Sequence, residues 1–488
     1  MSAGSDHLRR MYRAQRILLA VTCVLCLALF KRLWDIDSIE QSIKAFSKAG
    51  SEAWSRSYHA YLEGDGPVFD QRREMRCAEY SGLEDLAIIL KTGSTEIYQK
   101  LPMHLYTTFD CVKDHLIYSD IEQEVAGAHV RDALALTSDH ARTEREQLKP
   151  YKTLNEYYHL GGDAADLRGE KSWQLDKWKF LPMISDAREV FGERKKWYFF
   201  VEADTYVSLQ NLLPWIAKLD HKEPIFAGAQ VMIGDTEFGH GGSGWLLSST
   251  AAESLSKTYQ GNLSEWEKLV DNDCCGDLII AKVFLAADPP VHLLRSFPLI
   301  QGETVTSLDW SSTHWCKPAV TWHHVDSAMI DKLWQFERRW SISYGTNKPI
   351  LFKDYYHAFI HPRLLATNGS LPGWDNLSND WKFSAESEEK DERPYTISAE
   401  ACKDFCKENE ECLQWSWRPG SCKAGKRVRF GWALENRPQL GSAEDRIEDT
   451  KGKSLEGAVS GWVIERIEKF RTEMDACNEA KMWPTKNA

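Results

Sequence analysis

A continuous apolar run, Trp197 to Val201, constrains the fold of this chain more than any other feature. An uninterrupted run of this length is typical of a strand that is buried on both faces, as in the centre of a parallel sheet. Helical apolar spacing precedes the run at 172–191, and a helix can start near Asn211. The run therefore predicts an α/β domain in which helices cover a central sheet.

A second buried strand is predicted by the segment LEDLAIILKTGS, which ends in the polar residues Lys91, Thr92 and Gly93. A further strand before Asp120 completes a strand–helix–strand pattern, and residues 121–170 predict loops and short helices. Open α/β sheets bind ligands at the carboxyl ends of their strands. The loop at Thr92 and Gly93 is therefore a candidate binding loop.

Two carboxylates, Glu202 and Asp204, stand at the end of the opening run. Residues two apart on an extended strand point to the same side, so both can face one ligand. Neighbouring carboxylates repel each other unless a cation lies near them, and oxygen donors favour Mg²⁺ or Mn²⁺. The alternative is that Glu202 pairs locally with Arg194 or Lys196 while Asp204 forms an Asx-turn.

The formal net charge of −12 excludes a general nucleic-acid binder, which needs a surplus of Lys and Arg to neutralise phosphates. An anionic substrate would therefore need a local positive charge at its binding site. A divalent ion held by Glu202 and Asp204 would supply that charge and hold a diphosphate.

Three later segments carry further candidate residues. Gly241, Gly242 and Gly244 precede the strand-like WLLS, and glycines let a backbone approach a ligand closely, although a plain tight loop also explains them. Asp277 stands before an apolar helix, either as a general base or as an acid stabilised by the helix dipole. His323, beside His324, ends a β-like run and is a metal ligand or an ordinary core or surface histidine.

The N-terminus predicts one membrane segment. An uncharged apolar run at 17–30 follows four arginines, and basic and aromatic residues come directly after it. We expect a cytoplasmic tail at 1–16, a signal anchor at 17–34 and a stem at 35–75, so that the rest of the chain is translocated. A cleaved signal peptide and a buried helix are the alternatives.

The cysteines and sequons agree with a secretory lumen. Asn262, Asn368 and Asn376 begin Asn-x-Ser/Thr sequons. Two of the 12 cysteines lie in the apolar run, and an even set remains, which suggests disulfides in an oxidising compartment. That set is Cys77, Cys111, Cys274, Cys275, Cys316, Cys402, Cys406, Cys412, Cys422 and Cys477.

Four segments in order resemble the fringe and core 1 β1,3-galactosyltransferase group of inverting glycosyltransferases. WYFFVEADTYVSLQNL resembles the family's metal-motif segment, HGGSGWLLS its GGAGYVLS, CCGDLII its EDVxxG, and CKPAVTWHHVDS its AVSFHYVDS. IILKTG is similar to its first strand and turn. The resemblance implies a GT-A domain over 76–340, a Rossmann-like mixed α/β sheet that binds a nucleotide sugar.

The resemblance also implies roles for individual residues. The family's metal-binding Asp falls on Asp204, its metal-binding His on His323 rather than His324, and its acidic residue proposed as base near Asp277. Where the family commonly has three aspartates, this chain has Glu202-Ala203-Asp204. The residues expected to contact the nucleotide sugar or shape its cleft are Thr92, Gly93, Glu202, Gly241, Gly242 and Gly244.

The C-terminal part resembles a PAN/apple module, a small disulfide-rich α+β unit known for binding proteins or carbohydrates. We expect a linker at 341–394, the module at 395–470 and a tail at 471–488. Cys402 and Cys406 lie four apart, on one face of a helix. The resemblance implies the pairs Cys402–Cys422 and Cys406–Cys412. An appendage without a ligand is the alternative.

The sequence thus predicts a type II membrane enzyme of the Golgi or ER with a lumenal catalytic domain. It would transfer a hexose such as galactose, in β1,3 linkage and with inversion, from a UDP-sugar to a glycan or glycoprotein hydroxyl, with Mn²⁺ or Mg²⁺ as cofactor. The altered metal motif makes a non-enzymatic chaperone or glycan-binding relative the main alternative. A membrane-anchored adhesion protein is a third.

Overall fold

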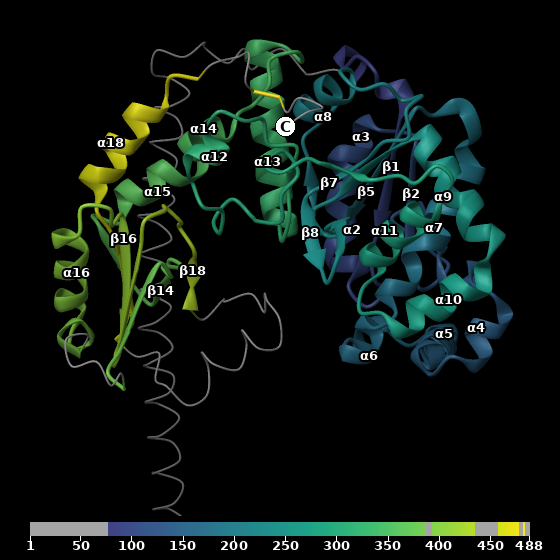
Figure 1. Cartoon of the computed structure of the whole chain (residues 1–488), viewed down its shortest axis with the longest axis horizontal. Helices are drawn as coiled ribbons and strands as arrows, with labels where there is room; N and C mark the ends of the chain where they lie inside the picture. The colour runs from purple at the N-terminus through teal and green to yellow at the C-terminus, as the bar shows by residue number, and fades with distance from the viewer. Residues whose placement is uncertain (1–76, 387–392, 435–456, 478–481, 484–488) are drawn as a thin grey trace, which may run out of the picture. The chain divides into compact units, whose positions relative to one another are not determined.

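The computed structural model describes residues 77–386, 393–434, 457–477 and 482–483 (Figure 1). Its largest sheet has eight strands in the order β11-β7-β10-β5-β1-β2-β4-β3. The strands are β1 (Leu86–Lys91), β2 (His115–Ser119), β3 (Gln123–Val125), β4 (Ala128–Asp132), β5 (Trp197–Glu202), β7 (Phe226–Gly228), β10 (Trp245–Ser248) and β11 (Leu293–Arg295). β1 is parallel to β2 and β5, whereas β10 is antiparallel to β5 and β7. The predicted mixed α/β sheet is confirmed.

Both faces of this sheet are buried. Along β1, Leu86, Ile88 and Leu90 belong to one core cluster, while Ala87 and Ile89 belong to another. Alternate residues of a strand point to opposite faces, so two clusters that share one strand lie on either side of it. A sheet covered on both faces explains why its central strands are uninterrupted apolar runs.

Helices supply both covering layers. The first cluster draws buried residues from α2 (Ile97–Tyr106), α3 (Thr108–Cys111), α8 (Leu209–Ile216) and α13 (Ser327–Tyr344). The second draws them from α7 (Asp176–Phe191), α9 (Ser249–Gly261), α10 (Leu263–Asn272) and α11 (Gly276–Ala286). Further helices are α4 (Asp139–Glu144), α5 (Lys149–His159), α6 (Glu170–Trp173), α12 (Ser312–Trp315), α14 (Phe352–Tyr355) and α15 (His361–Ala366).

The segment 121–170 differs from the loops and short helices expected, because it begins with the hairpin of β3 and β4. The turn between these strands is Ala126-Gly127, and both residues have positive φ, 50° and 79°. Such two-residue turns are usually announced by Asn-Gly or Asp-Gly. Ala126-Gly127 lacks that signal, which is why the hairpin is not evident in the sequence.

The segment expected as a linker, 341–394, is instead largely folded. α13 runs to Tyr344, and Ile350, Phe352 and Tyr355 are buried in the first core cluster. Three strands follow within it: β13 (Ser370–Pro372), β14 (Trp374–Asp375) and β15 (Trp381–Ser384). The part of the expected linker that the structure describes, 341–386 and 393–394, therefore contains helical and strand residues, some of which pack in the core.

The C-terminal sheet contains β13 and β15 together with later strands, in the order β13-β19-β16-β17-β15. It therefore begins before position 395, where the module was expected to start. The later elements are α16 (Ala399–Glu408), β16 (Gln414–Arg418), β17 (Ser421–Gly425), β18 (Trp432–Ala433), β19 (Val459–Trp462) and α18 (Ile464–Met474).

Disulfides join α16 to this sheet region. Cys402 pairs with Cys422, and Cys406 with Cys412, as the second resemblance implies. The remaining bonds are Cys77–Cys111, Cys274–Cys275 and Cys316–Cys477. All ten cysteines of the even set are therefore paired, which confirms the prediction that they form disulfides. Membership of the PAN/apple group stays a prediction.

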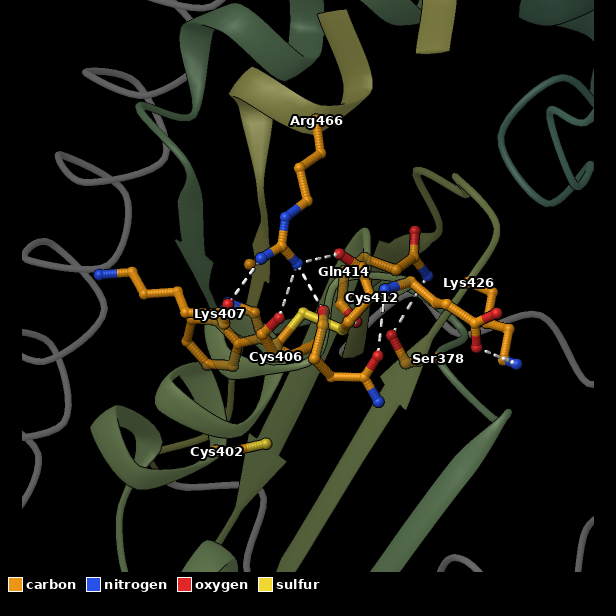
Figure 2. The surroundings of a disulfide bond; sticks show 12 residues. Ser378, Cys402, Cys406, Lys407, Cys412, Gln414, Lys426 and Arg466 are labelled. Carbon is orange, nitrogen blue, oxygen red and sulfur yellow. Dashed lines mark hydrogen bonds and ion pairs between the residues drawn. A yellow bond between two sulfur atoms is a disulfide. The ribbon is translucent and has the colours of Figure 1, made fainter. Parts of the chain in front are cut away.

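Arg466 of α18 donates hydrogen bonds to carbonyl groups at and just after the C-terminal end of α16 (Figure 2). Its Nη1 donates to the carbonyl oxygens of Cys406, Asn409 and Cys412 at 2.9, 2.6 and 2.9 Å, and its Nη2 to that of Lys407 at 2.6 Å. The last carbonyls of a helix have no partner within the helix, and a cation favours this end of the helix dipole. One guanidinium therefore satisfies the end of α16 and fixes α18 to the disulfide loop.

The expected tail at 471–488 begins inside α18, and Cys477 is bonded to Cys316. Of the three sequons, Asn262 and Asn368 are exposed, whereas Asn376 is fully buried. The side-chain nitrogen of Asn376 donates to the carbonyls of Trp415 and Gly461 at 3.0 and 3.1 Å. Asn376 is therefore unsuited to carry a glycan in the folded protein, contrary to expectation.

Within the described ranges, no helix is both long enough and apolar enough to cross a membrane. The expected cytoplasmic tail, signal anchor and stem, at 1–16, 17–34 and 35–75, lie outside those ranges. The membrane segment stays a prediction from the sequence.

Candidate functional site

The carboxyl ends of β2, β1 and β5 meet at one edge of the large sheet, because these neighbouring strands are parallel. Asp120, directly after β2, accepts from the Ser94 backbone N–H at 2.8 Å and from Lys179 Nζ at 3.1 Å. Lys179 Nζ also donates to the carbonyl of Thr92 at 2.9 Å. Asp120 and Lys179 were not among the predicted site residues, although the place of Asp120 at a strand end is a usable signal.

The predicted nucleotide loop contains two polar atoms without partners. The hydroxyl oxygens of Thr92 and Ser94 are buried and make no hydrogen bond to any described residue. Buried hydroxyls normally find a partner, so each such atom requires an explanation. A ligand at this loop would supply the missing partners.

Glu202 is engaged by a buried lysine. Lys91 is 3% exposed, and its Nζ lies 3.0 Å from Glu202 Oε1 and also contacts Asp176 Oδ2. Burial alone would lower the pKa of Lys91, but the carboxylates of Asp176 and Glu202 raise it above the usual range. Lys91 is therefore charged and neutralises Glu202, so Glu202 as a metal ligand stays a prediction.

Asp204 and two histidines form a candidate metal centre. Asp204 precedes β6 (Tyr206–Val207), His323 and His324 follow β12 (Thr321–Trp322), and these short strands pair antiparallel. Ligand atoms of Asp204, His323 and His324 all lie within 4.8 Å of one another. The structure thus places Asp204 and His323, the two residues predicted as ligands, close together. It adds His324, to which the resemblance assigns no metal role.

The local backbone fits this arrangement. His324 has φ of 53°, a left-handed conformation that is uncommon for non-glycine residues and often marks functional sites. A Cβ on Gly242 would lie 2.3 Å from His323 Nε2. Only glycine at position 242 leaves room for the His323 ring where it stands.

Hydrogen bonds assign the ring nitrogens of His323. The Thr205 hydroxyl donates to the Gly242 carbonyl at 2.6 Å, so it accepts from His323 Nδ1–H at 3.0 Å. Nε2, on the side of Gly242, then carries the lone pair, whereas Nδ1 is the ring nitrogen 3.5 Å from Asp204 Oδ1. Burial lowers the pKa of His323 to about 4, so the ring is neutral at pH 7. A neutral imidazole with a free lone pair is the form that binds metals.

Asp204 supplies the oxygen donor of the centre. Its Oδ1 is buried and makes no hydrogen bond to a described residue, and its Oδ2 lies 3.1 Å from Lys100 Nζ. Burial by itself would raise the pKa of Asp204, but the charges of Lys100 and of His323 in its protonated form outweigh burial and lower it. Asp204 Oδ1 lies 3.5 Å from His323 Nδ1. One ionised carboxylate and two imidazoles are a donor set that suits Mn²⁺. Lys100 is a further neighbour that the sequence did not indicate.

Asp277 lies in the first turn of α11, as predicted. Its Oδ2 accepts from the Gly241 backbone N–H at 2.8 Å, and its Oδ1 from the Leu278 N–H at 2.9 Å. Burial raises the pKa of Asp277 despite these two bonds. A carboxylate with a raised pKa in a cleft wall can act as a general base, although its place in the helix also allows a structural role.

A cleft of about 780 Å³ joins most of these groups, and its wall includes Glu202, Gly241, Gly242, Asp277 and His323. Other predicted residues, Thr92, Gly93, Asp204 and Gly244, are not part of this wall. Gly244 has φ of 83°, and a Cβ there would lie 3.2 Å from the carbonyl of Phe200. Its visible role is therefore to let the chain turn into β10.

Comparison with known proteins agrees with this geometry. A model of the Fringe-like family matches residues 81–347, a range that contains every residue of the site described above. No curated protein matches the chain. The matched range covers more than half of the 488 residues, and the chain therefore belongs to the Fringe-like family, which implies glycosyltransferase activity.

Proposed function

We propose that the chain transfers a hexosyl group from a UDP-sugar to an acceptor hydroxyl with inversion at the anomeric carbon. The observation that carries this proposal is one cleft whose wall contains both His323 of the candidate metal centre and the half-buried carboxylate of Asp277. A transferase of this kind needs a site for a diphosphate and a base for an acceptor within reach of each other.

In this mechanism Asp277 accepts the proton of the acceptor hydroxyl. The hydroxyl oxygen forms a bond to the anomeric carbon of the donor as the bond from that carbon to the diphosphate oxygen breaks. The electron pair of the broken bond leaves with UDP. The Gly241 N–H holds the Asp277 carboxylate in place.

Asp204, His323 and His324 would hold a divalent ion, Mn²⁺ or Mg²⁺, which neutralises the negative charge on the departing diphosphate. Thr92 and Ser94 have buried hydroxyls available for the nucleotide part of the donor. Lys100 holds the second oxygen of Asp204 and so orients that carboxylate.

Calorimetric titration of UDP into the full-length protein tests this proposal. We expect binding with Mn²⁺ present and its loss when EDTA is added, because the acidic site repels a diphosphate without the ion. Binding that is equal in EDTA would contradict the metal role.

Absence of UDP binding under both conditions would favour a non-enzymatic relative that serves as a chaperone or glycan-binding protein. The ion pair between Lys100 and Asp204 is the observation that favours this second candidate, since Lys100 already occupies one oxygen of the metal-binding carboxylate.

We also propose that the enzyme is a type II membrane protein whose catalytic domain lies in the lumen of the Golgi or ER. The apolar run after four arginines and the five disulfides support this topology, because disulfides persist in oxidising compartments. We expect the domain to resist protease in intact microsomes and to be digested once detergent is added. Digestion without detergent would contradict the topology.

A further inference from the structure

Apolar side chains line a part of the cleft that the mechanism above does not use. Trp173 is 73% exposed, and Val231 and Ile233 are 37% and 42% exposed, yet all three belong to the cleft wall. Large apolar side chains exposed together beside a site mark a surface that binds something. Phe238, which is buried, continues the same wall inward.

These residues come from separate segments that meet at the cleft. Val231 and Ile233 lie on β8 (Gln230–Ile233), which pairs with β9 (Thr236–Gly239) so that Val231 stands opposite Phe238. Residues two apart on a strand share one side, so Val231 and Ile233 face the cleft together. Trp173 ends α6, just before α7 begins at Asp176.

This apolar wall lines the same cleft as the predicted base, Asp277. Cys274 and Cys275, joined by a disulfide, belong to the cleft wall and directly precede the turn that carries Asp277. The base must contact the acceptor hydroxyl, so the acceptor occupies the space beside Asp277. The donor diphosphate belongs instead with the metal centre at His323. Trp173, Val231 and Ile233 are therefore assigned to the acceptor.

The charges in this wall argue for a neutral occupant. Lys177 points its Nζ at the carbonyl oxygens of Asp271 and Asp273, at 3.2 and 2.7 Å. The carboxylate of Asp273 is in turn held by Lys282 at 2.7 Å. Lys177 and Asp273 are thus engaged by the protein itself, as are Asp176 and Glu202 of the same cleft through Lys91. The apolar faces beside them are left to contact a ligand.

We propose that Trp173, Val231 and Ile233 form the acceptor subsite and that it binds a sugar ring of a neutral glycan. A hexose presents a face of C–H groups, which packs on an aromatic ring by dispersion and burial of apolar area, while its hydroxyls stay free to reach Asp277. This inference rests on the proposed function and names the class of its acceptor.

The test measures binding of the full-length protein to an array of immobilised neutral glycans, with UDP and Mn²⁺ present. Trp173→Ala should weaken binding to the glycans that the wild type selects by about tenfold, the size expected for loss of one aromatic stacking contact. Trp173→Phe should restore most of it. Tyr106→Ala is the matched control, because Tyr106 is an equally exposed aromatic residue, at 74%, outside the cleft.

Turnover gives a second readout. For a glycan that accepts sugar, Trp173→Ala should raise the acceptor KM and leave kcat and the affinity for UDP unchanged. Glycan binding equal to wild type in Trp173→Ala, or no glycan binding by a wild type that binds UDP, would overturn the inference and leave the proposed function intact. No UDP binding with Mn²⁺ would instead overturn the proposed function.

Discussion

Asp204→Ala should lower turnover by roughly 1000-fold and abolish Mn²⁺-dependent binding of UDP. Asp204 is the carboxylate in the group with His323 and His324, and its Oδ1, which makes no hydrogen bond to a described residue, is the oxygen available to a cation. Loss of a metal-held charge costs several kcal/mol in the transition state, and about 4 kcal/mol corresponds to a factor of 1000. Steady-state kinetics and calorimetric titration of UDP measure the two effects.

Asp110→Ala is the matched control for this substitution. Asp110 is a surface aspartate of α3, with its side chain 66% exposed and paired with Lys113. We expect it to leave turnover and UDP binding unchanged. Thermal unfolding should show that Asp204→Ala is folded, because Lys100 keeps Glu96 as a partner at 2.9 Å. Full turnover in a folded Asp204→Ala protein would refute the metal assignment.

Asp277→Asn should lower kcat by about 1000-fold while UDP still binds as in the wild type. General base catalysis contributes about 100- to 10,000-fold, and an amide cannot accept the acceptor proton. The amide oxygen of the substituted side chain can still accept from the Gly241 N–H, so the local backbone should stay in place. The measurement compares kcat with the dissociation constant of UDP in Mn²⁺.

The structural alternative for Asp277 predicts a different result. A carboxylate that only complements the dipole of α11 contributes about 0.3–1 kcal/mol to stability and nothing to kcat. Unchanged turnover with a slightly lower melting temperature would therefore support that role. Asp273→Asn is the control, because Asp273 belongs to the same cleft wall but is paired with Lys282.

The sequence predicted the central strands well for a physical reason. Burial on both faces of a sheet requires uninterrupted apolar residues, so β1 and β5 stand out in the chain itself. The carboxylates at the end of β5, Glu202 and Asp204, were evident for the same reason, because they follow such an apolar run. By contrast, the turn of β3 and β4 at Ala126-Gly127 has no strong turn signal, and its hairpin was missed.

Partners distant in the chain were not predictable. Lys100 and Asp204, and likewise Lys179 and Asp120, meet only because α2 and α7 pack beside the strand ends. The pairing of Glu202 with Lys91 changes the expected role of Glu202, and it depends on the register of β1 against β5, in which these two residues are opposite. The ion-pair partner of a charged residue cannot be read from the sequence when that partner lies far away along the chain.

The sequence by itself determined the α/β class, the place of Asp204 and Asp277 at the ends of elements, and the need for disulfides among an even set of cysteines. These features are local, because they follow from periodicity, from the ends of apolar runs and from composition. Only the tertiary structure decided that His324 joins Asp204 and His323, that 341–386 is folded, and that Trp173, Val231 and Ile233 line one cleft. Such contacts depend on strand pairing and helix packing between segments far apart in the chain, which local pattern does not encode.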